Sequence, residues 1–289
     1  MRVFAGIIML ISLLLSGITA VEAQKRKNEK KSVKKMDRTS DQSSQFRVVL
    51  EGDYSGIEEP FIFVARDIET YNLLKELGID LPSASKFNFP YVGIVAIFAG
   101  TRPTPGYKIQ VSQKNGAVAI SVVSPPPNAI LPQVLTSPYK IVAIPVDEEK
   151  PLPVEVPSSW KMETYRISRG NIGYSGGFAP REKNFDVDGK INVFRLRGFE
   201  GLVTLSFSLT AKSDVEIKMF ETASGKIEGG KVKLNWVDPG NFSEFPRPSM
   251  KASGVLLQNR ITLKFEPNPT NVADGFEAYG EIEAVKSRN

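Results

Sequence analysis

Two short motifs contain residue types and spacings that occur in catalytic or metal-binding loops. Residues 173–177 read Gly-Tyr-Ser-Gly-Gly, which fits the G-x-S-x-G spacing of the nucleophile elbow in serine hydrolases. That chemistry needs a histidine to accept the serine proton, and the sequence contains no His and no Cys. The same absence removes imidazole and thiolate zinc sites. We therefore predict no catalytic residue, and we interpret 173–177 as a flexible glycine-rich loop.

The second motif, Asp-Val-Asp-Gly at 186–189, is similar to the first half of a calcium-binding loop. Such a loop needs a further oxygen ligand two residues on and a bidentate glutamate at its twelfth position. Lys190 and Ile191 stand where oxygen ligands are needed, so we expect Asp188 and Gly189 to form a two-residue hairpin turn instead. Nothing else indicates a metal or a cofactor, and we predict neither.

Residues 98–107, Phe-Ala-Gly-Thr-Arg-Pro-Thr-Pro-Gly-Tyr, lie between two strand-like runs. A proline follows both Arg102 and Thr104, which favours extended geometry at these two residues. Gly106 can adopt a positive φ at little cost. We therefore predict a stiff loop that joins two strands and presents Arg102, Thr104 and Tyr107 to a partner. The alternative is a rigid hairpin corner with Tyr107 packed inward.

The same loop begins a longer pattern. Residues 100–107 read Gly-x-Arg-Pro-Thr-x-Gly-Tyr, a proline cluster follows at 125–127, and residues 133–145 read Gln-Val-Leu-Thr-Ser-Pro-Tyr-Lys-Ile-Val-Ala-Ile-Pro. This pattern resembles the PrcB C-terminal-domain family over roughly residues 46–145, apart from Pro105, where the family usually has a second glycine. The family takes its name from an accessory subunit of a bacterial surface protease complex. The predicted partner-binding residues are Gly100, Arg102, Pro103, Thr104, Pro105, Gly106 and Tyr107.

Two functional hypotheses follow. The resemblance implies an exported, non-enzymatic accessory protein that binds a protein partner, with a secreted or surface protease as one candidate. Residues 102–107 are also similar to the Asn-Pro-Thr-Thr-Gly-Tyr loop of chagasin-like protease inhibitors, which implies inhibition instead. Arg102 and Pro105 depart from that loop, and the two other loops of the inhibitor family are not found. An enzyme that uses carboxylates or a Ser-Lys pair is a third alternative, but nothing singles out such a pair.

The N-terminal residues have the composition of a secretory signal peptide at 1–23. Arg2 is followed by an apolar core at 7–15 that is too short to span a bilayer, and Val-Glu-Ala at 21–23 fits a cleavage site. We expect the mature chain to begin near Gln24 and to be exported to the periplasm or the exterior of a bacterial cell. No later apolar stretch is long enough for a membrane span.

Residues 24–45 are polar and are expected to form a disordered basic tail. Eight Lys or Arg and two acidic residues fall within 25–38, so the tail accounts for the net charge of +5, and the remaining chain is close to neutral. A nucleic-acid-binding surface needs basic residues on a folded face, so we predict no nucleic-acid partner. The tail either contacts anionic surfaces or serves as a solubilising spacer.

The remaining chain is predicted to be mainly β, with two β-rich domains. Residues 46–146 form a β-sheet domain with one packed helix, which Asp67 caps and Gly78 ends. Ile68, Tyr71, Leu74 and Leu77 recur at a spacing of three and are expected to share its buried face.

Residues 147–158 are charged and proline-rich, and are expected to form a semi-rigid linker across which the two domains fold separately. In 159–289, seven or more strands with alternating apolar and polar residues predict a β-sandwich or an open barrel.

Overall fold

The computed structural model describes residues 46–114, 116–146, 150–175, 183–196, 201–211, 217–238, 249–268 and 277–287. The predicted signal peptide (1–23) and basic tail (24–45) lie outside these residues. The described residues are mainly β with one short α-helix, which confirms the predicted fold class, and they fall within one compact unit, Ser44–Asn289. In this part of the chain no helix is long and apolar enough to cross a membrane.

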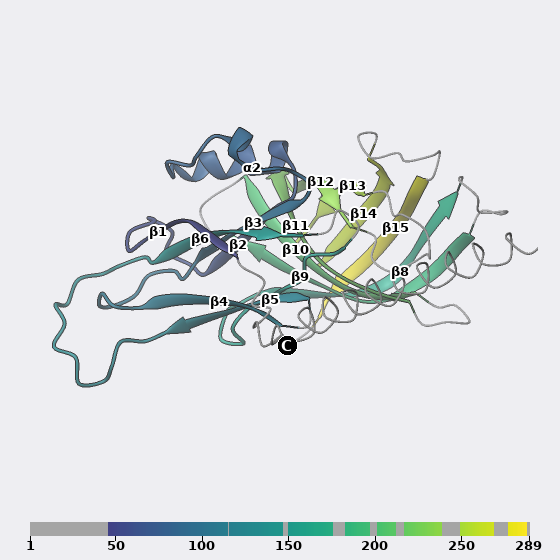
Figure 1. The fold of residues 1–289 in the computed structure, drawn as a ribbon. Coiled ribbons are helices and arrows are strands. Elements are labelled where there is room, and N and C mark those ends of the chain that lie inside the picture. Colours follow the sequence, from purple (N-terminus) through teal and green to yellow (C-terminus); the bar gives the residue numbers. More distant parts are fainter. Residues whose placement is uncertain are drawn as a thin grey trace, which may run out of the picture. The chain divides into compact units, whose positions relative to one another are not determined.

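A four-stranded antiparallel sheet forms the centre of the N-terminal part (Figure 1). The strand order is β1-β6-β3-β2, so β6 and β3 are central and β2 is at one edge. These three strands are apolar on both faces, and Phe61 through Ala65 of β2 are all buried. Such continuous apolar runs are typical of strands that are covered on both sides. The strands are β1 (Arg47–Gly52), β2 (Phe61–Ala65), β3 (Val92–Phe98) and β6 (Tyr139–Pro145).

The predicted helix begins and ends where its capping residues indicate. The Asp67 side chain accepts a hydrogen bond from the Thr70 N–H at 2.8 Å, helix α2 (Ile68–Leu73) continues into the 3₁₀ helix η2 (Leu74–Leu77), and Gly78 follows with φ 72°. A further 3₁₀ helix is η3 (Ala84–Lys86).

The prediction for the helix's apolar face was wrong at Ile68. Tyr71 and Leu74 are fully buried and Leu77 packs against the core, but Ile68 is 53% exposed. Three residues advance an α-helix by about 300°, which is about 60° short of a full turn. Two such steps separate Ile68 from Leu74, so their side chains point about 120° apart. Three such positions therefore do not all face the sheet.

A second, three-stranded sheet includes two residues of the segment that was predicted to be a linker. Strands β4 (Lys108–Lys114) and β5 (Ala117–Val123) form an antiparallel hairpin, and β7 (Val154–Glu155) pairs in parallel with β5. Leu152 is 1% exposed, and the Val154 N–H donates to Oγ1 of Thr222 at 3.0 Å. Leu152 and Val154 are thus packed against other elements, whereas Lys150, Glu155 and Ser158 of the same segment are exposed. That the two parts fold separately stays a prediction.

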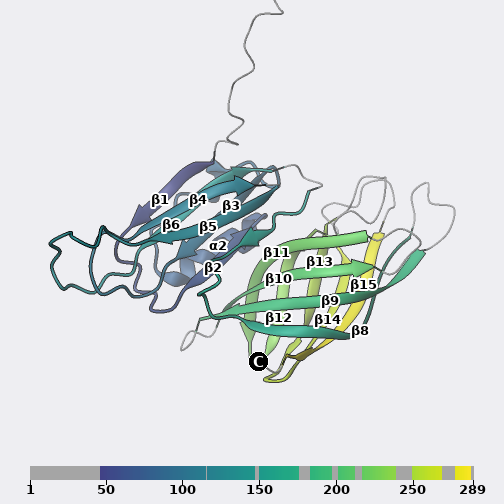
Figure 2. The same cartoon turned by 90° about the horizontal axis from the view of Figure 1, so that it is seen from below.

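The C-terminal part is a closed eight-stranded antiparallel barrel, whose strands are seen from the side in Figure 2. Neighbours in sequence are neighbours in space, and pairing of the last strand with the first closes the barrel. Alternate residues of one strand, such as Val203, Leu205 and Phe207, pack in the interior. The strands are β8 (Glu163–Ser175), β9 (Lys183–Arg195), β10 (Leu202–Ala211), β11 (Ile217–Glu228), β12 (Lys231–Val237), β13 (Met250–Leu256), β14 (Arg260–Pro267) and β15 (Glu277–Lys286).

Side chains on the barrel form hydrogen bonds with β2, one of the sheet's two edge strands. The Val64 N–H donates to Oγ of Ser224 at 2.7 Å, and Oγ1 of Thr204 donates to the Ile62 carbonyl at 2.7 Å. The two hydroxyls are 2.6 Å apart. Because an open strand edge invites pairing with another chain, these contacts protect β2.

The predicted hairpin turn at Asp188 and Gly189 was wrong, because both residues lie inside β9 and pair with β10. Gly189 has φ 138°, and a Cβ atom there would lie 2.1 Å from the Ser208 carbonyl oxygen. Glycine is therefore required for the close approach of two backbones, and not for a turn.

Gly189→Ala is expected to destabilise the protein more than Gly229→Ala. Both glycines have a positive φ, but a Cβ at Gly229 would meet nothing within 4 Å. Gly229→Ala should cost about 1 kcal/mol for its backbone conformation. Gly189→Ala should cost roughly 1–3 kcal/mol more because its methyl group collides with β10. Chemical denaturation of both variants measures the difference, and equal losses would contradict the close approach.

Candidate functional site

The predicted partner-binding residues, 100–107, lie in the loop 99–107, which joins β3 to β4 and is held by backbone hydrogen bonds. The Ala99 N–H donates to the Pro138 carbonyl at 2.8 Å. Arg102 and Thr136 exchange two backbone hydrogen bonds, at 2.7 and 2.9 Å, as in an antiparallel sheet. The loop is therefore tied along its length to the chain that enters β6.

Two glycines allow the loop to take this path. Gly100 has φ 76°, and a Cβ atom there would lie 2.8 Å from the backbone nitrogen of Pro60 and 2.9 Å from the Glu58 carbonyl oxygen. Gly106 has φ 90°, a conformation that glycine adopts at little cost. Both positions exclude larger residues, the first by contact and both by backbone conformation.

The arginine of the loop turns back onto the loop itself. Nη2 of Arg102 donates to the Ala99 carbonyl at 2.7 Å, and its guanidinium carbon lies 5.5 Å from the centroid of the Tyr107 ring. Arg102, Thr104 and Tyr107 are half-buried, whereas Pro103 is exposed. The Thr104 carbonyl accepts from Oγ1 of Thr136 at 3.1 Å. That these residues contact a partner stays a prediction.

Arg102→Ala is expected to lower the free energy of unfolding by about 1 kcal/mol, because the Ala99 carbonyl loses its side-chain donor. The stacking on Tyr107 is lost as well. Lys108→Ala, at an exposed position next to the loop, is the control and should change stability by less than about 0.5 kcal/mol. Urea denaturation compares the two, and equal stabilities would mean that Arg102 is free in solution.

Two neighbouring segments form one surface with this loop. One is residues 53–57, and the other is residues 124–138 between β5 and β6, named here the arm. Oγ of Ser137 accepts from the N–H groups of Ser55 and Gly56 at 2.9 and 3.0 Å. A Cβ on Gly106 would lie 3.3 Å from Cβ of Pro125, so the arm also packs on the other end of the loop.

This surface carries large apolar side chains that the sequence reasoning did not single out. Tyr54 and Leu135 are each 68% exposed, Val134 is 46% exposed and Ile130 is fully exposed. The sequence did contain a signal for this surface. Residues 124–138 include no charged residue, and their four large aliphatic residues do not alternate as in a strand: Ile130, Leu131, Val134 and Leu135. Contiguous exposed apolar groups are typical of interaction sites.

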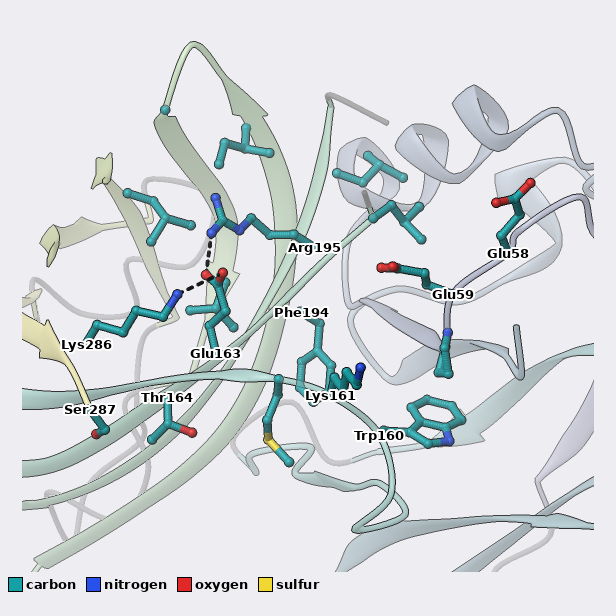
Figure 3. Close-up of a pocket in the computed structure, with 18 of the residues that line it drawn as sticks. Glu58, Glu59, Trp160, Lys161, Glu163, Thr164, Phe194, Arg195, Lys286 and Ser287 are labelled. Atoms are coloured by element: carbon teal, nitrogen blue, oxygen red, sulfur yellow. Dashed lines mark hydrogen bonds and ion pairs between the residues drawn. The ribbon is translucent and has the colours of Figure 1, made fainter. Parts of the chain in front are cut away.

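A pocket of about 1110 Å³ lies at the end of the barrel where β8 and β10 begin and β9 and β15 end (Figure 3). Its charged centre is Glu163, the first residue of β8, which pairs with Arg195 at the end of β9 and with Lys286 at the end of β15. Nζ of Lys286 lies 3.1 Å from Oε1 of Glu163. Trp160 and Phe194 contribute apolar walls.

The pKa values of Glu163 and of Tyr165, whose hydroxyl donates to Glu163, are both shifted away from neutral pH. Burial acts to raise the pKa of Glu163, but hydrogen bonds from Arg195 and Lys286 outweigh it and leave this pKa below its usual value. Burial and the Glu163 charge raise the pKa of Tyr165 to about 12. Neither group exchanges a proton near neutral pH, as a general acid or base would have to do. The cluster therefore fits a structural role better, in which ion pairs hold three strand ends together.

The two sequence motifs do not form reactive sites in the described residues. Gly173 to Ser175 continue strand β8, whereas a nucleophile elbow needs a turn from strand to helix. The remaining residues of that motif, 176–177, lie outside the described residues. Among the residues that the structure describes, no group of three or more Asp, Glu, His or Cys is placed to hold a metal ion.

A cluster of buried charges joins the barrel to the loop between β2 and α2. Arg66, Glu221 and Asp238 are each 2% exposed or less. Nη1 of Arg66 lies 4.0 Å from Oδ2 of Asp238, and its guanidinium carbon lies 5.5 Å from the Trp236 ring. Oε2 of Glu221 accepts from the Leu152 N–H at 2.9 Å. The cluster was not predicted, because its members come from distant parts of the sequence.

A match to a known family covers the first of these sites. No curated protein and no solved structure matches the chain. Residues 94–145 match the family model described as PrcB C-terminal, a range that runs from β3 through the 99–107 loop, the β4–β5 hairpin and the arm to the end of β6. The resemblance predicted from residues 100–107 and 133–145 is thereby confirmed, and this part of the chain is similar to the PrcB C-terminal family.

Proposed function

We propose that this protein is an exported, non-enzymatic accessory protein that binds a protein partner through the end of the sheet formed by the 99–107 loop. The observation that carries the proposal is the family match, which covers this loop and the segments that hold it. Its braced backbone supports recognition, because a preformed surface loses little conformational freedom on binding. The absence of His from the whole sequence argues against triad catalysis.

Export is part of the same proposal and rests on the apolar core at 7–15 and the small-residue site at 21–23. A secreted or surface protease is the partner class that the family name supports. N-terminal sequencing of the exported protein should show that it begins near Gln24. A protein that keeps Met1 after export would contradict the signal peptide.

The test of partner binding is co-purification of the tagged full-length chain with proteins of the native envelope fraction. Pro103→Asp places a charge on an exposed position of the loop, and it should lose the partner that the parent retains. Ser253→Asp, at an exposed position of barrel strand β13, is the matched control and should retain it. If both variants recover the same proteins as the parent, the loop is a structural corner. Inhibition of a recovered protease by the chain would support the chagasin-like hypothesis instead.

A further inference from the structure

The arm is a long connection without a helix or strand of its own, and it is nevertheless fixed at several points. It extends beyond the ends of the strands of both sheets (Figures 1 and 2). Thr136 pairs with Arg102, Ser137 receives two N–H groups, and Pro125 packs by Gly106. Connections of this length without secondary structure are uncommon in compact domains and are either functional or disordered, and this one is fixed to its neighbours. Holding the arm is therefore one clear structural role of the 99–107 loop.

The arm directs apolar side chains into solvent. Ile130 is 102% exposed and Leu135 is 68% exposed, and neither belongs to the apolar core. Tyr54, 68% exposed, lies on the neighbouring segment and pairs with Ser137, two residues beyond Leu135. Exposed side chains of this size gain free energy when they leave water, so a surface that keeps them exposed is poised to be covered.

The charge pattern of this surface restricts what can cover it. Residues 123–138 contain no charged residue. The neighbouring segments 53–57 and 99–107 contribute Asp53 and Arg102, and the Arg102 guanidinium is engaged with Ala99 and Tyr107. A nucleic acid or an acidic lipid surface would find almost no cation here. A charged protein patch would lose its water without gaining a counter-ion.

We propose that the arm docks into an apolar, uncharged groove of the partner protein, with Ile130, Leu135 and Tyr54 as its anchors. This inference rests on the proposed function and names the chemistry of that partner's surface. A protruding side chain needs a concave receptor. A two-fold contact between two copies of the chain would bring this same surface against itself, so the protruding side chains would need a hollow within the surface that carries them. The occupant is therefore a different protein rather than a second copy.

The experiment begins with benzoylphenylalanine at position 130 or 135 of the tagged full-length chain, photo-crosslinked in the native envelope fraction. The crosslinked protein is identified by mass spectrometry and purified, and its affinity for the parent and for variants is measured. Ile130→Ser and Leu135→Ser should each weaken binding roughly tenfold or more, as truncation of a central anchor does. Binding by the parent should change little between low and high salt. Leu257→Ser, which alters an exposed leucine at the β13–β14 turn, should bind like the parent.

The outcomes separate this inference from the proposed function. If Pro103→Asp loses a partner but the serine variants bind it like the parent, the arm proposal is wrong and the proposed function stands. If no protein crosslinks and Pro103→Asp has no effect, the arm proposal and the proposed function are both wrong. Self-association of the purified chain that Ile130→Ser abolishes would make a second copy the occupant. Flotation with neutral phosphatidylcholine vesicles that Ile130→Ser abolishes would make it a lipid surface, and either result overturns the proposal.

Discussion

Replacing Arg66 with methionine is expected to lower the free energy of unfolding by about 3–5 kcal/mol, because it breaks a buried ion pair by removing one partner. Arg66 and Asp238 are each 2% exposed, and Nη1 of Arg66 lies 4.0 Å from Oδ2 of Asp238. The same nitrogen donates to the Lys150 carbonyl at 2.6 Å, so a backbone acceptor also loses a donor. Methionine keeps much of the side-chain volume, so the loss reports charge more than a cavity.

Arg260→Met is the matched control, since it breaks an ion pair on the surface of the same barrel. Nη2 of Arg260 lies 3.3 Å from Oε1 of Glu283, but the arginine side chain is 54% exposed. Exposed pairs contribute roughly 0–1 kcal/mol, so this variant should be nearly as stable as the parent. Chemical denaturation of both variants gives the comparison. Equal, small losses would show that Arg66 reaches water in solution.

The buried cluster also shows where reasoning from the sequence stops. Arg66, Glu221 and Asp238 carry no local pattern that marks them as buried, because charged residues are usually exposed. Only the folded chain brings them together. The same is true of Leu152 and Val154, which sit among prolines and charges and were predicted to belong to a linker. Their pairing with β5 and with barrel side chains is set by distant residues.

Local chemistry was predicted well where it depends on a few neighbouring residues. Asp67 caps the helix, Gly78 ends it, and Gly106 has a positive φ, since each follows from the conformational preference of one residue type. Alternating residues likewise predicted the β-rich second half. Alternation cannot decide between a sandwich and a closed barrel, however, because both bury one face of every strand. Pairing of β15 with β8 makes the difference.

At the candidate site, too, the local backbone could be predicted from the sequence, but the side-chain contacts could not. The composition of residues 98–107 predicted a stiff loop between two strands, and the loop is held by backbone hydrogen bonds on both sides. The direction of the Arg102 side chain could not be predicted, because it depends on a carbonyl and an aromatic ring that the fold places near it. The exposure of Ile130 and Leu135 was equally hidden, since a short apolar run fits a buried segment just as well.

Stability is expected to fall as the pH rises from about 4.5 to about 8, and Glu221 is the group responsible. Burial raises the pKa of Glu221 to about 8 from an ordinary value of 4.5, Arg66 opposes this rise, and Asp238 adds to it. Between these values the folded chain keeps a proton that the unfolded chain has released. Each pH unit in that window therefore removes up to about 1.4 kcal/mol. Below the window both states bind the proton, and above it neither does, so the dependence ends on both sides.

Glu221→Gln tests this directly, because glutamine keeps the shape and an oxygen for the Leu152 N–H but has no proton to release. The variant should lose the slope and should be more stable than the parent at the upper end of the window. Glu228→Gln, at an exposed position of the same strand, should keep the parent's slope. Urea denaturation at intervals across the window measures all three proteins. A slope that survives in Glu221→Gln would show that another group causes it. A neutral Glu221 leaves Arg66 and Asp238 to balance each other, which is the arrangement that best tolerates burial of all three groups.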